Sequence, residues 1–205
     1  MSSLMIPGMF LVLGGLLIPL LPKGLRKGFA IALPFISCAQ MHYMPSDLIL
    51  EAEMFGYVLY PVRVDKLSLV WGYVFHLAAL LSVIYQLHVK DTLQDVSGLT
   101  YAGAAIGAAF AGDLITLFVF WELTAITSVF LIYANRTERS ATVGTRYLII
   151  QVASGVILFF GILLWIQDQG QAIDLSFGNT YDPDGPWELT GMFVDANSGD
   201  PTSIA

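Results

Sequence analysis

The segment Leu114–Ala134 reads LITLFVFWELTAITSVFLIYA, and it is long and apolar enough to cross the hydrocarbon core of a bilayer as one helix. Its only charged residue is Glu122, which lies about 12 Å into the helix at a rise of 1.5 Å per residue. A carboxylate near the bilayer centre costs at least ~2.5 kcal/mol, so it is usually retained for an ion pathway or a specific partner. The segment therefore predicts a membrane protein and indicates ion movement.

The composition agrees with an integral membrane protein. Of 205 residues, 56% are hydrophobic and only 12% are charged, against about 25% charged in soluble proteins. The net charge of −7 argues against a nucleic-acid partner. A single cysteine, Cys38, excludes a disulfide framework within the chain and is expected to be a small packing residue in an apolar stretch.

We predict an all-α integral membrane protein with about six transmembrane helices. Six apolar stretches are long enough to be considered as spans, at about Leu4–Leu21, Gly28–Met44, Leu67–Leu87, Val96–Phe110, Leu114–Ala134 and Arg146–Gln167. The fourth, SGLTYAGAAIGAAFAG, is rich in Gly and Ala, which let helix backbones approach closely in lipid. We therefore expect the fourth helix to be interior and tightly packed.

The basic residues predict the orientation. With an extracytoplasmic N-terminus, seven basic residues fall on the cytoplasmic side and only Arg63 and Lys66 fall outside; the seven are Lys23, Arg26, Lys27, Lys90, Arg136, Arg139 and Arg146. This distribution obeys the positive-inside rule. The charges also follow the first apolar run, the reverse of an export signal, so the first helix should stay uncleaved. Both termini are expected outside.

Two polar regions flank the predicted spans. Between the second and third helices, two runs rich in Leu, Ile, Val and Tyr surround Gly56, which predicts a small extracytoplasmic β-hairpin; an irregular loop is the alternative. We divide the chain into a transmembrane domain, residues 1–167, and an acidic extracytoplasmic loop or tail, residues 168–205. The tail contains seven acids and no Lys or Arg: Asp168, Asp174, Asp182, Asp184, Glu188, Asp195 and Asp200.

Titratable residues inside the spans are the candidate functional residues. Glu122 is the first candidate, as a proton-translocation carboxylate, with a static protonated and hydrogen-bonded acid as the alternative. His76 lies inside the third helix, where it is either a proton relay or a packed histidine bonded to a neighbouring helix. His42 and His88 fall near helix ends, where an interfacial role is expected.

Other polar residues have local explanations. Asp65 and Asp113 precede apolar runs and are expected to cap helix N-termini. We find no Gly-rich phosphate loop, no His or Cys cluster at metal-ligand spacing and no nucleophile elbow. The sequence therefore predicts no cofactor and no metal site.

The block from Ala111 to Trp165 resembles the proton-conducting membrane transporter family, which includes the antiporter-like subunits of respiratory complex I and of Mrp-type sodium/proton antiporters. The WE pair at Trp121 and Glu122 and the QVASG run at Gln151–Gly155 carry the resemblance. PVRVDKLSLVWGYVF, at residues 61–75, is similar to the family's third-helix entrance, with Asp65 and Ser68 in place. Within this family the sequence most resembles the D-type subunit of the Mrp antiporters, and it is also similar to the A-type subunit and to the complex I relatives.

This resemblance implies a transporter subunit of about fourteen helices with two inverted five-helix repeats. Glu122 matches the family's functional glutamate on the fifth helix, which pairs with a lysine on a broken seventh helix. No intramembrane lysine occurs in this chain, so we expect it to be an N-terminal portion of such a subunit, inactive in transport by itself. The resemblance also implies a bacterial inner membrane and further subunits as partners.

The sequence thus predicts a proton- and cation-translocating subunit of a multisubunit monovalent cation/proton antiporter, with sodium, or else potassium, as the cation. Three alternatives remain: a subunit of a complex I-like redox-driven proton pump, a scaffold subunit that does not transport, and a quinone-reactive membrane enzyme to which Trp121, His76 and Glu122 would contribute. We expect a transporter subunit, not an enzyme, because the buried acid and the resemblance agree.

Overall fold

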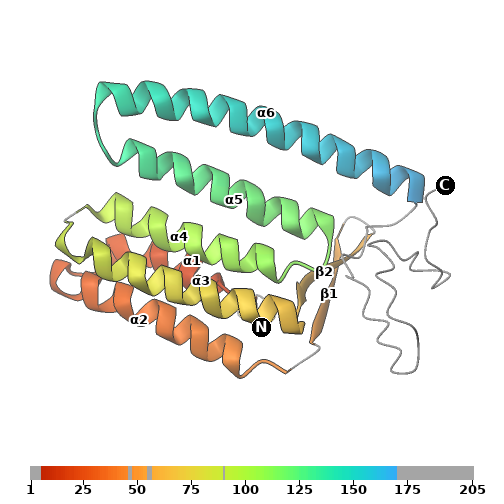
Figure 1. Ribbon diagram of the computed structural model, residues 1–205, viewed down its shortest axis with the longest axis horizontal. Helices are drawn as coiled ribbons and strands as arrows, with labels where there is room; N and C mark the ends of the chain where they lie inside the picture. The colour runs from red at the N-terminus through yellow and green to blue at the C-terminus, as the bar shows by residue number, and fades with distance from the viewer. Residues whose placement is uncertain (1–5, 46–47, 55–56, 90, 170–205) are drawn as a thin grey trace.

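The structure is a computed structural model that describes residues 6–45, 48–54, 57–89 and 91–169. The described residues form six α-helices, two short 3-10 segments and one β-hairpin (Figure 1). In chain order these are α1 Met9–Leu17, η2 Ile18–Leu20, α2 Lys23–His42, β1 Ile49–Met54, β2 Tyr57–Arg63, α3 Lys66–Tyr85, η3 Gln86–His88, α4 Thr92–Ala109, α5 Leu114–Tyr133 and α6 Glu138–Gln169.

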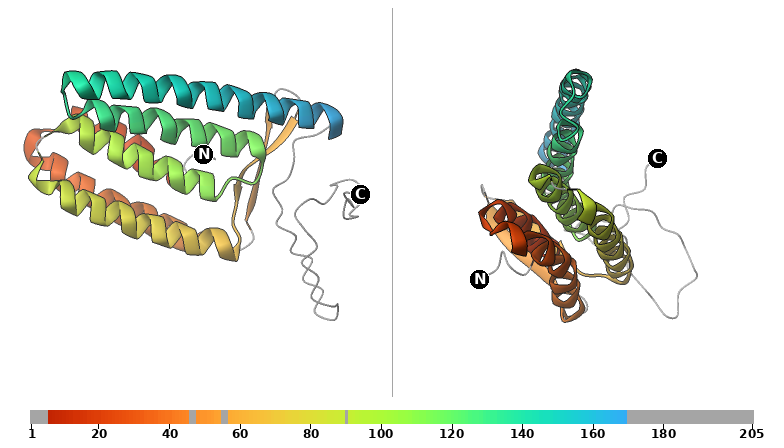
Figure 2. Two further views of the ribbon diagram at one scale, coloured as in Figure 1. Left: turned by 45° about the horizontal axis from the view of Figure 1, so that its top comes forward. Right: turned by 90° about the vertical axis from the view of Figure 1, so that its left-hand side faces the viewer.

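The helices run roughly along one axis and alternate in direction, so that their connections gather at two ends. One end, which we call the hairpin end, holds β1, β2 and the turn between α4 and α5; the other, the basic end, holds the α1–α2, α3–α4 and α5–α6 turns (Figure 1). Helices α1 to α4 pack as a four-helix group, α5 lies along α4, and α6 lies along α5 (Figure 2). Helices α5 and α6 therefore extend the four-helix group to one side.

Small residues make α4 the central helix, as predicted. Gly103 faces α1, where a Cβ atom would approach the carbonyl oxygen of Gly8 and the side chain of Val12. Gly107 faces α5, where a Cβ atom would overlap the ring of Phe120. Because close backbone approach replaces the hydrophobic driving force between helices in lipid, these two glycines allow α4 to contact α1 and α5 together.

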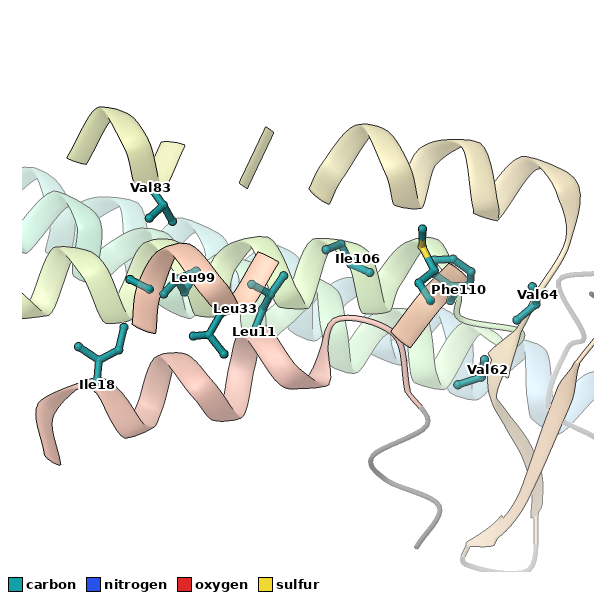
Figure 3. Packing of buried hydrophobic residues seen from close by; sticks show 11 residues of the cluster. Leu11, Ile18, Leu33, Val62, Val64, Val83, Leu99, Ile106 and Phe110 are labelled. Atoms are coloured by element: carbon teal, nitrogen blue, oxygen red, sulfur yellow. The ribbon is translucent and has the colours of Figure 1, made fainter. Parts of the chain in front are cut away.

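The buried apolar core lies where α1, α2, α3 and α4 meet and continues to the hairpin. Figure 3 labels these members of the core: Leu11, Ile18, Leu33, Val62, Val64, Val83, Leu99, Ile106 and Phe110. Most other large apolar side chains on the helices are exposed, as expected for surfaces that contact lipid. Helix α6 is the extreme case, with Ile149, Ile150 and Ile157 each at least 64% exposed.

Within the described residues, three helices are long and apolar enough to cross a membrane by themselves: α3 with η3, α5 and α6. The α1–η2 segment is apolar but shorter, and α2 and α4 carry charged or polar residues in their first turns. The prediction of an all-α integral membrane protein is confirmed. Of the other helices, α4 packs on α3 and α5, α1 packs on α4, and α2 packs on α3 and α1.

The predicted β-hairpin is present, which excludes the irregular loop. Strands β1 and β2 pair antiparallel, with an irregularity between Leu50 and Ala52. Backbone bonds fasten the hairpin to the α4–α5 turn, because Arg63 N donates to Phe110 O at 2.8 Å and Gly112 N donates to Tyr60 O at 2.9 Å. A Cβ at Gly112 would lie 2.8 Å from the Cβ of Tyr60, so this contact requires glycine.

Four helix starts differ from the prediction: α1 begins later than predicted, at Met9 and not Leu4, and three other helices begin earlier. Helix α2 begins at Lys23 and not Gly28, α4 begins at Thr92 and not Val96, and α6 begins at Glu138 and not Arg146. In these three cases a polar first turn is helical although it adds nothing to an apolar span. Helix α6 continues to Gln169, and the rest of the predicted acidic tail lies outside the described residues.

Candidate functional site

Glu122 lies on the side of α5 that packs against α6. Its side chain is only partly exposed, and its Oε1 atom is buried with no hydrogen-bond partner in the described part of the chain. Leaving a buried polar atom unpaired costs about 1–3 kcal/mol. The neighbouring Trp121 is 51% exposed, in contrast to this buried oxygen. The structure therefore places an uncommitted carboxyl oxygen inside a helix contact.

The surface that Glu122 meets on α6 is Gly155. A Cβ atom built on Gly155 would overlap Oε1 of Glu122, and it would lie 2.7 Å from Cδ and 3.0 Å from Oε2. The same two helices are held on one side of this contact by the stacked rings of Phe118 and Phe159, with centroids 4.9 Å apart. The carboxyl group thus occupies the space that any side chain at position 155 would fill.

His76 is 3% exposed and joins α3 to α2. Its Nδ1 lies 2.7 Å from the carbonyl oxygen of Gly72, and its Nε2 lies 2.8 Å from the Oγ of Ser37. A carbonyl only accepts, so Nδ1 carries a proton, and in the neutral ring Nε2 accepts from the Ser37 hydroxyl. That hydroxyl can also rotate and accept from a charged ring. The site accommodates both forms of the imidazole.

The two candidates lie at similar depths but in different contacts. From the helix starts at the hairpin end, Glu122 is about 12 Å along α5 and His76 about 15 Å along α3. Helix α4 packs against both α3 and α5, so it separates the two sites. Among the described residues, no hydrogen bond joins Glu122 to His76. The structure does not bring them together into one site.

A second polar cluster lies at the basic end. Lys27 Nζ contacts both carboxylate oxygens of Asp95, at 2.8 and 2.9 Å, and also donates to Gln86 O at 3.1 Å. Arg26 donates to Thr92 Oγ1 at 2.9 Å. The predicted spans leave Lys27 in a loop and give Asp95 no role. A basic residue and an acid at the starts of two helices are the signal that could have paired them.

Asp65 and Asp113 cap helices, as predicted. Asp65 accepts from Ser68 N at 2.6 Å while its own amide donates to Ser68 Oγ, which completes a capping box at α3. Asp113 is fully buried and accepts from Thr116 N at 2.8 Å, from Thr116 Oγ1 at 2.7 Å and from Tyr60 N at 2.8 Å. Asp113 therefore joins α5 to the hairpin, a role that its sequence position did not indicate.

The remaining histidines are exposed. Nδ1 of His42 lies 2.8 Å from the Tyr73 hydroxyl, and the ring of His88 contacts Tyr85 edge to face. No group of three or more His, Cys, Asp or Glu residues that could hold a metal ion occurs in the described ranges.

Comparisons with known proteins identify related sequences. Residues 111–187 match the family described as NADH:quinone oxidoreductase/Mrp antiporter, TM. The A-type subunit of the Na(+)/H(+) antiporter from Bacillus subtilis is 32% identical over 91 residues, 43% of this chain and 11% of that protein. The N-type subunit of NADH-quinone oxidoreductase from Desulfitobacterium hafniense is 30% identical over 155 residues, 71% of this chain and 30% of that protein.

A solved structure shares the fold. One chain of the membrane-bound sulfane sulfur reductase, an archaeal respiratory membrane complex, matches with a TM-score of 0.70 and 18% identity over 83% of this chain. This chain spans 28% of that chain, and 11% and 30% of the two sequence relatives. The resemblance stated from the WE and QVASG motifs is confirmed, since both motifs lie inside the matched residues.

Proposed function

Because the chain belongs to the proton-conducting antiporter-like family, we propose that it is a proton- and cation-translocating subunit of a multisubunit monovalent cation/proton antiporter. Sodium is the proposed cation, with potassium as the alternative. The other subunits of the complex and the lipid bilayer are its proposed partners. We propose a bacterial inner membrane as its location, because the two sequence relatives are bacterial. The distribution of basic residues supports an orientation with both termini outside.

The observation that carries this proposal is the state of the Glu122 carboxyl. An acid that passes protons must exchange them with changing partners, so an oxygen already held by a fixed donor is poorly suited to the task. Oε1 of Glu122 is buried and has no such donor among the described residues. A static structural acid would instead be expected to have its hydrogen bonds satisfied. Glu122 is therefore the proposed proton carrier.

His76 is the second proposed titratable group. Its ring can gain or lose a proton while both nitrogens keep a partner, because the Ser37 hydroxyl can donate or accept. His76 lies in the contact between α2 and α3, away from the contact that holds Glu122. A proton path through His76 would therefore be separate from one through Glu122. We assign the chain transport and no covalent chemistry.

The test uses the complete complex in membrane vesicles. Glu122→Gln keeps the volume of the side chain and removes the titrating proton, so sodium-driven proton movement should be abolished or strongly reduced at normal abundance. Glu122→Asp should retain more activity. Glu138→Gln is the matched control, because Glu138 is an exposed acid in the first turn of α6. This substitution should leave transport unchanged. Normal transport by the Gln variant would remove Glu122 from the path.

A redox-driven proton pump is the second candidate function, favoured by the relative named as the N-type subunit of NADH-quinone oxidoreductase, which matches 71% of this chain. The same vesicles distinguish the two. An antiporter moves protons when a sodium or potassium gradient is imposed without an electron donor. A redox-driven pump moves them only when a donor and quinone are supplied. If the chain is only a scaffold, both kinds of transport should be unchanged in Glu122→Gln.

A further inference from the structure

The glycines of α6 have three different environments. A Cβ on Gly144 would overlap the ring of Tyr133, a Cβ on Gly161 would meet nothing within 4 Å, and a Cβ on Gly155 would overlap the carboxyl group of Glu122. Gly155 is therefore the described α6 glycine whose missing side chain makes room for the acid. Gly161 offers a control in the same helix, where the added methyl group has open space.

The atom that a Cβ on Gly155 would meet is the far end of a flexible side chain, and the helix backbones are not involved. An alanine can therefore be accepted by rotation of the Glu122 side chain, without separating α5 from α6. Alanine also favours helix more than glycine does. A substitution at position 155 should thus move the carboxyl group and leave the fold intact.

We propose that Gly155 is a positioning residue for Glu122. Because glycine has no side chain, it leaves a space on α6 in which the Glu122 carboxyl group lies, and this space sets the position of the carboxyl group in the α5–α6 interface. The inference rests on the proposed function of Glu122 and goes beyond it by naming the residue that sets its position. A displacement of about 1 Å can lower the rate of a positioned reaction about 10²-fold, so the effect on proton transfer is large.

The transport experiment compares Gly155→Ala with Gly161→Ala in the complete complex in vesicles. Gly155→Ala should lower the maximal rate of cation-coupled proton movement at least about ten-fold with unchanged abundance and thermal stability, whereas Gly161→Ala should leave the rate unchanged. A normal rate in Gly155→Ala, or an equal loss in both variants, would overturn the proposal.

A second-site variant separates positioning from a general packing defect. Glu122→Asp shortens the acid by one methylene group and makes room for a methyl group at position 155. The fold loss caused by Gly155→Ala should therefore be smaller in the Asp background than in the Glu background. An equal fold loss in both backgrounds would contradict the proposed contact.

A readout independent of transport keeps this inference distinct from the proposed function. A hydrophobic carbodiimide reacts with carboxyl groups that are accessible from lipid, and mass spectrometry measures the modified fraction of Glu122. Modification should be faster in Gly155→Ala, because the carboxyl group is displaced from the interface, and unchanged in Gly161→Ala. Full transport in Glu122→Gln would defeat the proposed function alone. An unchanged modification rate in Gly155→Ala would defeat the inference even if Glu122 is essential.

Discussion

The ammonium group of Lys27 lies 2.8 Å from Oδ1 and 2.9 Å from Oδ2 of Asp95, and so joins the start of α2 to the start of α4. Asp95 is buried, with 9% of its side chain exposed, whereas Lys27 keeps 30% of its side chain exposed. Lys27 also donates to the carbonyl of Gln86, where α3 ends. One cation therefore connects three helices at the basic end.

Lys27→Met should destabilise the protein, because it leaves the Asp95 carboxylate buried without its cation. Partial exposure of Lys27 moderates the loss, which we expect at about 1–3 kcal/mol. The free energy of unfolding is measured in mixed micelles by raising the fraction of a denaturing detergent. Lys23→Met is the control, because Lys23 is exposed in the same helix. Equal stability of the two variants would show that the pair contributes nothing.

Asp113→Ala should weaken both α5 and the attachment of the hairpin. The substitution removes the acceptor for three donors, two of them on Thr116 and one on Tyr60, and the site is fully buried. We expect a loss of about 1–3 kcal/mol, together with faster amide exchange at Tyr60. Asp91→Ala is the comparison, because that cap at α4 has a more accessible side chain and should cost less. Unchanged exchange at Tyr60 would contradict the link to the hairpin.

Features that depend on a few neighbouring residues could be predicted from the sequence. Asp65 with Ser68 three residues later predicts a capped helix start, and the structure has a capping box there. Gly and Ala in the fourth helix predict close packing, and Gly103 and Gly107 face two different helices. Each of these features depends on a few neighbouring residues, so a single chain displays it directly.

Features that depend on helix rotation could not be predicted. Helix α5 is apolar on all sides, so its pattern does not say which neighbour Glu122 faces, and the contact with Gly155 appears only in the packed structure. The start of α6 was missed for another reason. Hydropathy places the start of the span at Arg146, whereas α6 begins eight residues earlier, at Glu138. Thr137 and Ser140 cap this start, because the backbone amide of each donates to the side-chain oxygen of the other.

The orientation can be tested with single cysteines in a background where Cys38 is replaced by alanine. Glu53 is exposed on the hairpin and Thr137 is exposed at the basic end. The excess of basic residues predicts that Glu53→Cys reacts with an impermeant thiol reagent added to intact cells and that Thr137→Cys reacts only after lysis. Labelling of Thr137→Cys alone in intact cells would invert the orientation.

The contact between His76 and Ser37 should contribute a measurable coupling between α3 and α2. Hydrogen bonds between helices in a membrane average about 0.6 kcal/mol and reach about 1.7 kcal/mol, because the separated helices find other partners. His76→Ala and Ser37→Ala should therefore lose less together than the sum of the single losses, by an amount in this range.

The matched control for this cycle pairs His76→Ala with Ser128→Ala, because Ser128 lies on α5 and bonds to Ala125 and to Tyr147 on α6, away from the α2–α3 contact. These two losses should add, since distant sites without shared partners are independent. Additive losses for His76 and Ser37 would mean that the 2.8 Å contact is not maintained in the folded protein. A coupling accompanied by normal transport in His76→Ala would leave His76 a structural bridge and remove it as a relay.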